Sequence, residues 1–247
     1  MIRTILEKIE AGRSFLVASH ESPDGDAMAS TLALTNFLRE WGKDVIAYNR
    51  DGVPQDYAFL PGAERLVSEL PSGATFDVGF VLDAGELRRA GAHLKELCRT
   101  LVNIDHHPFS EDFGDVYYVD EEASATGALI YRLVKASGRP LSRDVALCVY
   151  TAILADTGSF RYSNANPEAF TTAAEMVARG INPWDVASSL YESQDEKRLR
   201  LLAQSLATLT VSSCGRYASV AVTQAMYDQA QAGVEHTDGF VNYPRSV

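Results

Sequence analysis

Leu101-Val102-Asn103-Ile104-Asp105-His106-His107 is an apolar run that ends in one acid and two imidazoles. Its first residues are typical of a buried strand, because strands of a parallel sheet covered on both faces read as short apolar runs. Its last three residues are of the types that bind metal ions and transfer protons, because histidine is the commonest metal ligand and a carboxylate can orient an imidazole. Taken alone, the tripeptide fits equally well a polar loop that happens to contain two histidines.

Two other predicted strands also lead into polar groups. Residues 14–19 run into His20-Glu21-Ser22-Pro23-Asp24-Gly25-Asp26, and residues 76–82 run into Asp83. The carboxyl ends of parallel strands share one edge of a sheet, where ligands of open α/β sheets bind. We therefore predict an α/β fold with a doubly wound, mainly parallel sheet, followed by a helical connector and the start of a smaller α/β domain.

Hydrophobic periodicity and turn residues predict the remaining elements. Further strands are expected at 44–48, 116–119, 209–211 and 217–222. Helices are expected at 3–11, 27–40, 88–99, 124–136, 142–155, 167–179, 183–191 and 193–207.

Length and composition describe an ordinary globular protein. The chain has 247 residues, of which 46% are hydrophobic and 22% are charged, so it can bury a core. We expect residues 1–191 to form a first domain, 192–208 a connector helix, and 209–247 part of a second domain. That last segment is short for an independent core, so we expect the second domain to be incomplete.

Charge and cysteine content limit the cellular compartment and the binding partners that we expect for this protein. Isolated Cys98, Cys148 and Cys214 fit buried thiols in a reducing compartment better than a disulfide framework. The amino terminus lacks the apolar core of a signal peptide and no segment has the length of a membrane span, so we expect a cytoplasmic protein with no membrane partner. A net charge of -11 argues against binding of long duplex nucleic acid. Small anionic substrates remain compatible with it, because bound divalent cations reverse the local sign.

Each polar cluster has a structural interpretation and a chemical one. Capping of the following helix explains one acid of the 20–26 loop, whereas an imidazole with several carboxylates suits a Mn²⁺ or Mg²⁺ site. Asp156 ends a strongly apolar predicted helix, where a buried carboxylate is costly unless it is paired or coordinated. The segment 124–127 opens a helix whose amino terminus either is simply capped or binds a phosphate.

Four ordered motifs carry a family resemblance: His20-x3-Asp24-x-Asp26, Asp83, Asp105-His106-His107 and Asp156-Thr157-Gly158. They resemble the motifs of the DHH phosphoesterases, and the residues around the first and last motifs most resemble the nanoRNase/pAp-phosphatase branch. The resemblance implies a phosphoesterase with two Mn²⁺ ions, for which Mg²⁺ or Co²⁺ could substitute. It implies short oligoribonucleotides, dinucleotides or 3'-phosphoadenosine 5'-phosphate as substrates, with cyclic dinucleotides as an alternative.

The resemblance also implies roles for individual residues. One ion would be held by His20, Asp24 and Asp83. The other would be held by Asp26, Asp83, His106 and Asp156. His107 would face the scissile phosphate, and Asp105 would orient an imidazole.

Outside the motifs, the candidate substrate contacts are Arg161, Asn164 and Arg245. For the first two, a surface arginine and a turn asparagine are equally good interpretations. His93 and His236 are expected at the surface. The Gly-Gly-Gly-His-type nucleotide-binding segment of the family is absent from this sequence, so we expect either a fragment or a protein without that segment.

Two rival functions remain open. Inorganic pyrophosphatases share the motifs, but they use a basic cluster in their second domain that is not visible here. An idle module that binds nucleotide or metal is the second rival, and the loss of a ligand position expected of it is not found. A homodimer is one assembly that we consider.

Overall fold

The computed structural model describes residues 1–192 and 194–247. The chain divides into two compact units, Met1–Ser189 and Leu190–Val247. Ser193, which falls in the predicted connector, lies outside the described residues. The predicted limits of the two domains and of the connector stay a prediction.

Unit 1 is built on a five-stranded parallel sheet in the order β2-β1-β3-β4-β5. The strands are β1 (Ser14–Ser19), β2 (Asp44–Tyr48), β3 (Phe76–Leu82), β4 (Cys98–Asp105) and β5 (Val116–Val119). The three central strands, β1, β3 and β4, are the apolar runs that end in polar residues, and their last five residues are buried in each case. The predicted α/β class and the parallel sheet are confirmed.

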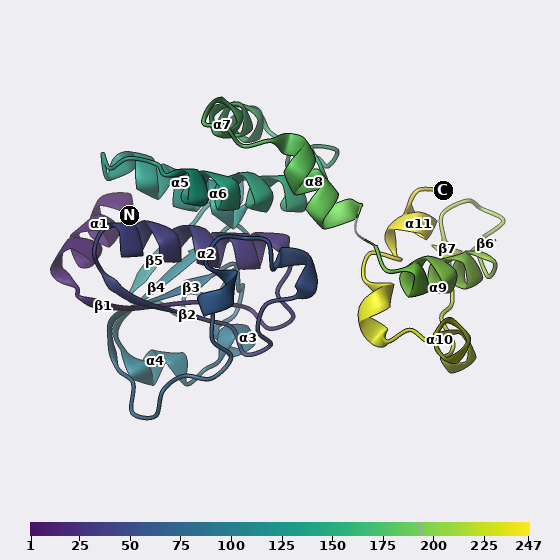
Figure 1. The fold of residues 1–247 in the computed structure, drawn as a ribbon, viewed down its shortest axis with the longest axis horizontal. Coiled ribbons are helices and arrows are strands. Elements are labelled where there is room, and N and C mark those ends of the chain that lie inside the picture. Colours follow the sequence, from purple (N-terminus) through teal and green to yellow (C-terminus); the bar gives the residue numbers. More distant parts are fainter. Residues whose placement is uncertain (193) are drawn as a thin grey trace. The chain divides into compact units, whose positions relative to one another are not determined.

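Helices cover both faces of this sheet (Figure 1). Helices α1 (Ile2–Ala11), α2 (Gly25–Glu40), α5 (Thr126–Ala136) and α6 (Arg143–Asp156) lie on one face. The short α3 (Leu87–Ala90) and α4 (Leu94–Leu97) lie on the other. Helix α2 packs between the sheet and α6, so it is buried continuously from Gly25 to Leu38. Helix α7 (Pro167–Ala178) packs against α6, and α8 (Pro183–Tyr191) follows it.

The predicted helix over 88–99 is wrong. Helix α3 stops at Ala90, because Gly91 adopts a φ of 126° that a helix cannot include. A second short helix follows, and β4 then begins already at Cys98. Close packing of the neighbouring strands explains this early start, since a Cβ on Gly79 of β3 would lie 2.3 Å from the Cys98 sulfur.

Unit 2 is small. It contains α9 (Glu196–Leu206), a hairpin of β6 (Thr210–Val211) and β7 (Ala218–Ser219), α10 (Gln224–Ala230) and α11 (Asn242–Arg245). The second strand is shorter than the predicted 217–222. Helix α9, which lies within the predicted connector, packs against α10, and its Leu201 shares a core with Ala230 and Phe240.

Single turns of 3-10 helix complete the elements at Gln55–Tyr57, Ala63–Arg65 and Val234–Thr237. Within residues 1–192 and 194–247, no helix combines the length and the apolar character that crossing a membrane requires.

Candidate metal centre

The strand register brings the predicted motifs to one edge of the sheet. Ser19 of β1 lies beside Leu82 of β3, which lies beside Ile104 of β4, so the residues that follow each strand meet at the same level. The chain passes from β1 to β2 on one side and from β3 to β4 on the other. The gap between β1 and β3 is therefore the topological switch point, where open α/β sheets bind their ligands.

Asp83 stands at the centre of this edge in a strained conformation. It follows β3 with a φ of 56°, a left-handed value that costs a non-glycine residue about 1 kcal/mol or more. Its backbone N–H donates to the Ile104 carbonyl at 3.0 Å, and the Thr126 hydroxyl donates to its Oδ1 at 2.9 Å. These bonds hold the buried carboxylate between the two predicted ion positions.

Asp26 lies in the first turn of α2 and faces the amino terminus of α5. The backbone N–H groups of Thr126 and Gly127 donate to its two oxygens at 2.6 and 3.0 Å, and the Ser30 hydroxyl donates at 2.7 Å. Only glycine fits at position 127, because a Cβ there would lie 2.3 Å from the Ala152 Cβ. Of the two interpretations of segment 124–127, capping is therefore the one that applies to these two N–H groups. The capping group is the carboxylate of Asp26, which belongs to another helix.

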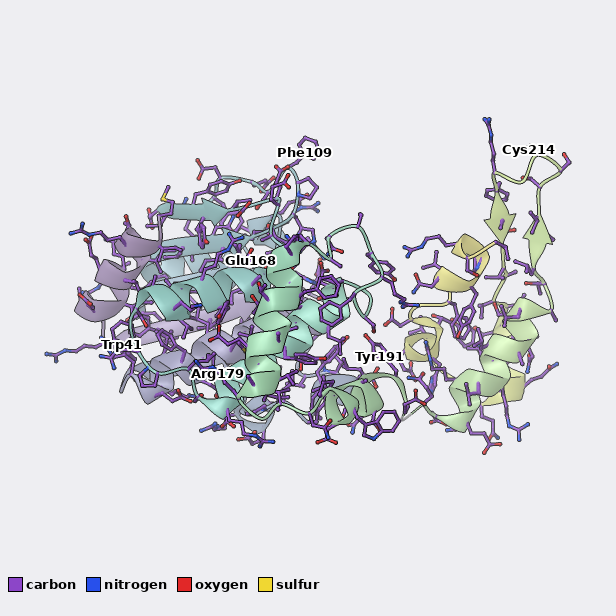
Figure 2. All side chains as sticks on the ribbon, turned by 90° about the horizontal axis from the view of Figure 1, so that it is seen from above. Trp41, Phe109, Glu168, Arg179, Tyr191 and Cys214 are labelled. Carbon is purple, nitrogen blue, oxygen red and sulfur yellow. The ribbon has the colours of Figure 1, made fainter. Side chains whose placement is uncertain are left out.

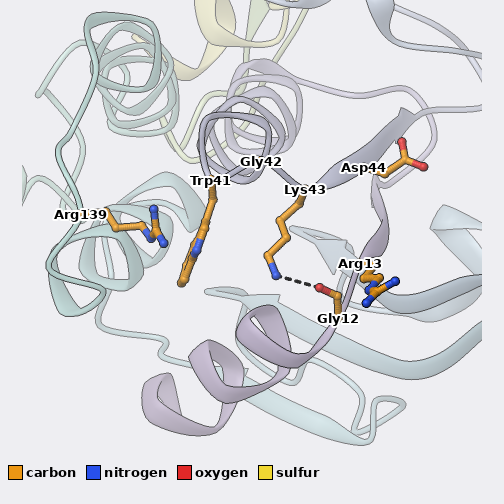
Figure 3. Close-up of a pocket in the computed structure, with 7 residues that line it drawn as sticks. All are labelled: Gly12, Arg13, Trp41, Gly42, Lys43, Asp44 and Arg139. Carbon is orange, nitrogen blue, oxygen red and sulfur yellow. Dashed lines mark hydrogen bonds between the residues drawn. The ribbon is translucent and has the colours of Figure 1, made fainter.

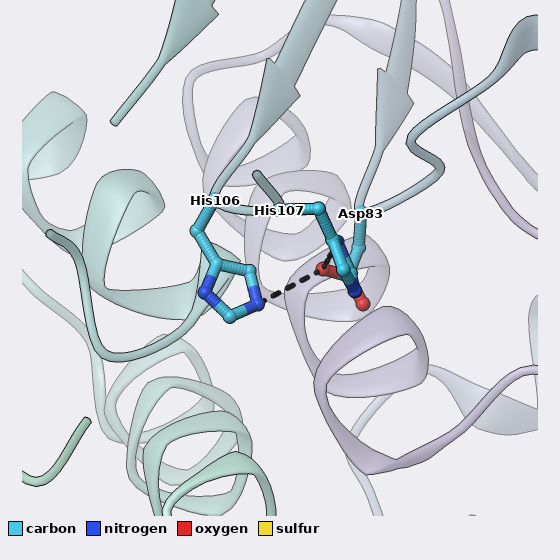
Figure 4. A group of neighbouring side chains, drawn as sticks. All are labelled: Asp83, His106 and His107. Carbon is cyan, nitrogen blue, oxygen red and sulfur yellow. Dashed lines mark ion pairs between the residues drawn. The ribbon is translucent and has the colours of Figure 1, made fainter. Parts of the chain in front are cut away.

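His106 presents a lone pair to three carboxylates, of which Figure 4 shows that of Asp83. Its Nδ1 lies 3.2 Å from the Ala123 carbonyl, which can only accept, so the proton is assigned to Nδ1. The buried Nε2 has no hydrogen-bond partner among the described residues. It lies 3.7 Å from Asp26, 3.6 Å from Asp83 and 3.7 Å from Asp156. A cation between these atoms would satisfy all four.

His20 repeats this arrangement beside Asp83. Its Nδ1 lies 2.6 Å from the Glu21 carbonyl, which can only accept, and 3.2 Å from the Arg89 guanidinium, which can only donate. The shorter contact assigns the proton to Nδ1, so Nε2 again carries the lone pair. That Nε2 lies 3.9 Å from Asp24 and 3.8 Å from the second oxygen of Asp83. The buried amide of Asn49 donates to the His20 carbonyl at 2.8 Å and fixes the loop.

Burial opposes the charge of these acids. It raises the pKa of Asp26 to about 7 and raises the pKa of Asp83 well above its usual value, with the neighbouring acids adding to the effect at both. Burial also raises the pKa of Asp156. Carboxylates and imidazoles that each lack a counter-charge are the donor set of a divalent cation site.

Three groups of side chains have ligand atoms within 4.8 Å of one another. The first two contain all six predicted metal ligands, and the third adds His107. The groups are His20, Asp24 and Asp83; Asp26, His106 and Asp156; and Asp83, His106 and His107. The structure thus brings together residues from four separate parts of the sequence.

Asp105 and His107 form a pair beside these groups. Nδ1 of His107 lies 2.8 Å from Asp105, whose oxygens also accept the backbone N–H groups of His106, His107 and Gly85. Burial alone would raise the pKa of Asp105, but hydrogen bonds from His107 and Ser110, together with the charge of His107, outweigh it and lower the pKa to about 2. The same bond raises the pKa of His107, whose side chain is 41% exposed.

The three predicted substrate contacts lie in different surroundings. Asn164 donates its amide to an Asp156 oxygen at 2.7 Å and to the Ser124 carbonyl at 3.0 Å, so its nitrogen orients a predicted ligand. Arg161 is exposed on the loop after Asp156, and its Nε donates to the Gly158 carbonyl. Arg245 lies in α11 of unit 2. Contact of these residues with substrate stays a prediction.

Several supporting groups have no local sequence pattern. Ser30, Thr126, Gly127 and the Ala123 carbonyl hold predicted ligands from behind. Arg89 was not predicted either, and its guanidinium lies 3.2 Å from Nδ1 of His20. Of these groups, only Thr126 and Gly127 belong to a predicted feature, the helix start at 124–127.

A basic hollow lies at the opposite, amino-terminal edge of the sheet (Figure 3). Trp41 stands between Arg139, whose guanidinium lies 3.9 Å from the ring centre, and Lys43. Lys43 donates to the carbonyls of Gly12 and Glu10 and so closes the carboxyl end of α1. These contacts give the hollow a structural explanation, and it is separate from the metal-ligand groups.

Comparisons with known proteins agree with this geometry. The N-terminal domain of the DHH family matches residues 14–153. The bifunctional oligoribonuclease and PAP phosphatase NrnA of Thermus thermophilus is 32% identical over the whole chain, which spans 72% of that protein. NrnA of Bacillus subtilis is 28% identical over 77% of the chain, which spans 61% of it.

A solved structure also superimposes closely. The exopolyphosphatase-related protein from Bacteroides fragilis is 28% identical, with a TM-score of 0.94 over 100% of this chain and 76% of its own. The predicted resemblance is confirmed: the chain belongs to the DHH family, within the branch that contains the NrnA proteins.

Proposed function

We propose that this chain is a metal-dependent phosphoesterase that hydrolyses short oligoribonucleotides and 3'-phosphoadenosine 5'-phosphate, with two Mn²⁺ ions as cofactor. The observation that carries the proposal is the buried Nε2 of His106, which faces oxygens of Asp26, Asp83 and Asp156 at 3.6–3.7 Å. The substrates named by the Thermus and Bacillus relatives support this substrate class.

The metal assignment follows the two clusters. His20, Asp24 and Asp83 would hold one ion, and Asp26, Asp83, His106 and Asp156 the other. Asp83 would be the shared ligand, because Nε2 of His20 lies beside its Oδ2 and Nε2 of His106 beside its Oδ1. Two divalent ions bound there would supply an activated water and neutralise charge that builds on phosphorus.

The chain's own residues complete the reaction. Water adds to phosphorus, the bond from phosphorus to the leaving ester oxygen breaks, and that oxygen takes up a proton. His107 is the proposed donor or stabilising group, because Asp105 anchors its Nδ1 and leaves the other nitrogen of a half-exposed ring for the substrate. Asp105 is thus a positioning residue.

The test compares four substrates in parallel with the Mn²⁺-loaded protein. Dinucleotide, 3'-phosphoadenosine 5'-phosphate, cyclic dinucleotide and pyrophosphate are offered separately, and mononucleotide or phosphate release is measured. The His106→Ala variant should lose an ion and turnover, whereas His93→Ala, a change of an exposed histidine outside the clusters, should lose neither.

Each outcome decides between functions. Release of mononucleotide or phosphate from either of the first two substrates supports the proposal. Turnover of pyrophosphate or cyclic dinucleotide alone would replace it with one of those activities. Two bound ions with no turnover of any substrate would favour a binding module.

A further inference from the structure

The loop that follows His107 carries an aromatic side chain directed away from the protein (Figure 2). We propose that Phe109 is a stacking platform for the nucleobase of the nucleotide whose phosphate is cleaved. This inference rests on the proposed function, and it names the group that would make the site prefer nucleotides over other phosphoesters.

The loop is held firmly on the carboxyl side of Phe109. The buried Asn103 donates its amide to the Ser110 hydroxyl and to the Glu111 carbonyl, both at 3.2 Å. The Tyr117 hydroxyl donates to the Ser110 carbonyl at 2.7 Å. The Glu111 N–H donates to the carbonyl of Gly85, two residues beyond Asp83, at 2.8 Å. These bonds tie the loop to the strand ends that carry the metal-ligand candidates.

Phe109 itself departs from what folding alone would favour. Its side chain is 95% exposed, the highest value among the large apolar side chains of the described residues. Its φ of 64° is left-handed, which is rare and costly for a bulky residue. Phe113, four residues later in the same loop, packs against the core instead. A loop that packs one phenylalanine partly against the core and holds the other outward under strain presents that ring for a contact.

The spacing suits a nucleotide. Two residues of extended chain span at most about 7 Å, so the Cα atoms of Phe109 and His107 lie within the length of one nucleoside of each other. A nucleotide whose phosphate faces His107 would therefore bring its base to the loop that carries Phe109. Stacking on an aromatic side chain is worth about 1–3 kcal/mol per base and tolerates every base. The platform would accordingly favour nucleotides without selecting a sequence.

The experiment compares a dinucleotide with the same dinucleotide lacking both bases. Phe109→Ala should raise KM for the dinucleotide roughly fivefold to a hundredfold, the equivalent of that stacking energy. It should leave the abasic substrate unaffected. Phe109→Leu, which keeps apolar bulk without the ring, should behave as Phe109→Ala, and Phe109→Trp should retain the wild-type KM.

A stability measurement distinguishes a Phe109 ring that is held out for a ligand from one that stabilises the folded loop. Phe109→Gly removes the ring and relieves the left-handed strain, so it should raise the unfolding midpoint while it raises KM. A lower midpoint would mean that Phe109 stabilises the loop, which would overturn the proposal. Equal effects on the intact and abasic substrates, or no effect on either, would overturn it as well.

Binding gives a readout that does not depend on turnover. In the Mn²⁺-loaded Phe109→Trp variant, adenosine monophosphate should quench fluorescence beyond the level seen in the wild type, because the new indole would stack on adenine. If the wild type cleaves nothing and this quenching is present, the proposed function fails and the platform stands. If the wild type cleaves dinucleotide and the quenching is absent, the platform alone is refuted.

Discussion

Without metal, the protein should lose stability as the pH rises from 5 to 7, because the carboxyl of Asp26 keeps a proton only in the folded chain. Burial raises the pKa of Asp26 from its ordinary 3.8 to about 7. Between these values the folded state holds a proton that the unfolded state has released. The resulting stabilisation is fully present below pH 3.8 and is lost as the pH rises through the folded pKa.

The magnitude follows from proton linkage. Each pH unit inside this window removes about 1.4 kcal/mol of unfolding free energy for one such group. Because the slope declines as the pH approaches 7, Asp26 alone accounts for roughly 2 kcal/mol between pH 5 and pH 7. The raised pKa values of Asp83 and Asp156 act in the same direction.

Urea unfolding in the presence of a chelator measures this slope. Both tryptophans, Trp41 and Trp184, lie in unit 1, so their fluorescence reports the part of the chain that holds Asp26. Asp26→Asn should flatten the slope, whereas Asp44→Asn, a change of an exposed acid at the other edge of the sheet, should leave it unchanged. Saturating Mn²⁺ should oppose the loss of stability with rising pH, because metal binds the deprotonated carboxylates.

A stability of the metal-free wild type that is constant or rises between pH 5 and pH 7 would refute this reasoning. So would an Asp26→Asn variant that retains the full slope, since another group would then have to bind the proton.

Three other predictions concern the loaded enzyme. Asp83→Ala should remove both ions, which metal analysis of the purified variant checks; two ions retained would exclude the bridging role. His107→Ala should keep both ions and lower kcat about a hundredfold or more, the usual contribution of a positioned proton donor; a fall in metal content would make His107 a ligand instead. Asn164→Ala should weaken metal binding about tenfold to a hundredfold in a Mn²⁺ titration, because Asp156 loses its orienting amide; an unchanged affinity with a raised KM would favour contact with substrate.

The sequence predicts the sheet well because its central strands are nearly continuous apolar runs. Residues 14–19, 44–48 and 76–82 form strands with the predicted limits. Their polar ends also predict one shared edge, since parallel strands place their carboxyl ends together. The helix predicted over 88–99 fails because the chain turns at Gly91 and because Cys98 packs on Gly79 of the neighbouring strand, a tertiary contact.

The partners of the site residues are harder to predict because they lie far away along the chain. Asp26 and Thr126 are 100 residues apart, and the packing of α2, α5 and α6 against one another brings them together. The same holds for the contact between His106 and the Ala123 carbonyl, which decides the histidine tautomer. Sequence motifs identify residues that could bind metal, whereas the direction of each lone pair follows from the tertiary structure.

The directions of these lone pairs determine how the site responds to a metal ion. Hydrogen-bond partners lie behind the inward-facing groups: Thr126 donates to Asp26 and Asp83, Asn164 donates to Asp156, and the outer nitrogen of His106 donates to the Ala123 carbonyl. The inner atoms are therefore acceptors that repel one another until positive charge enters. A chain built in this way gives up stability in its metal-free form to hold its ligands in place beforehand. Loss of a donor should accordingly lower metal affinity even when every ligand remains.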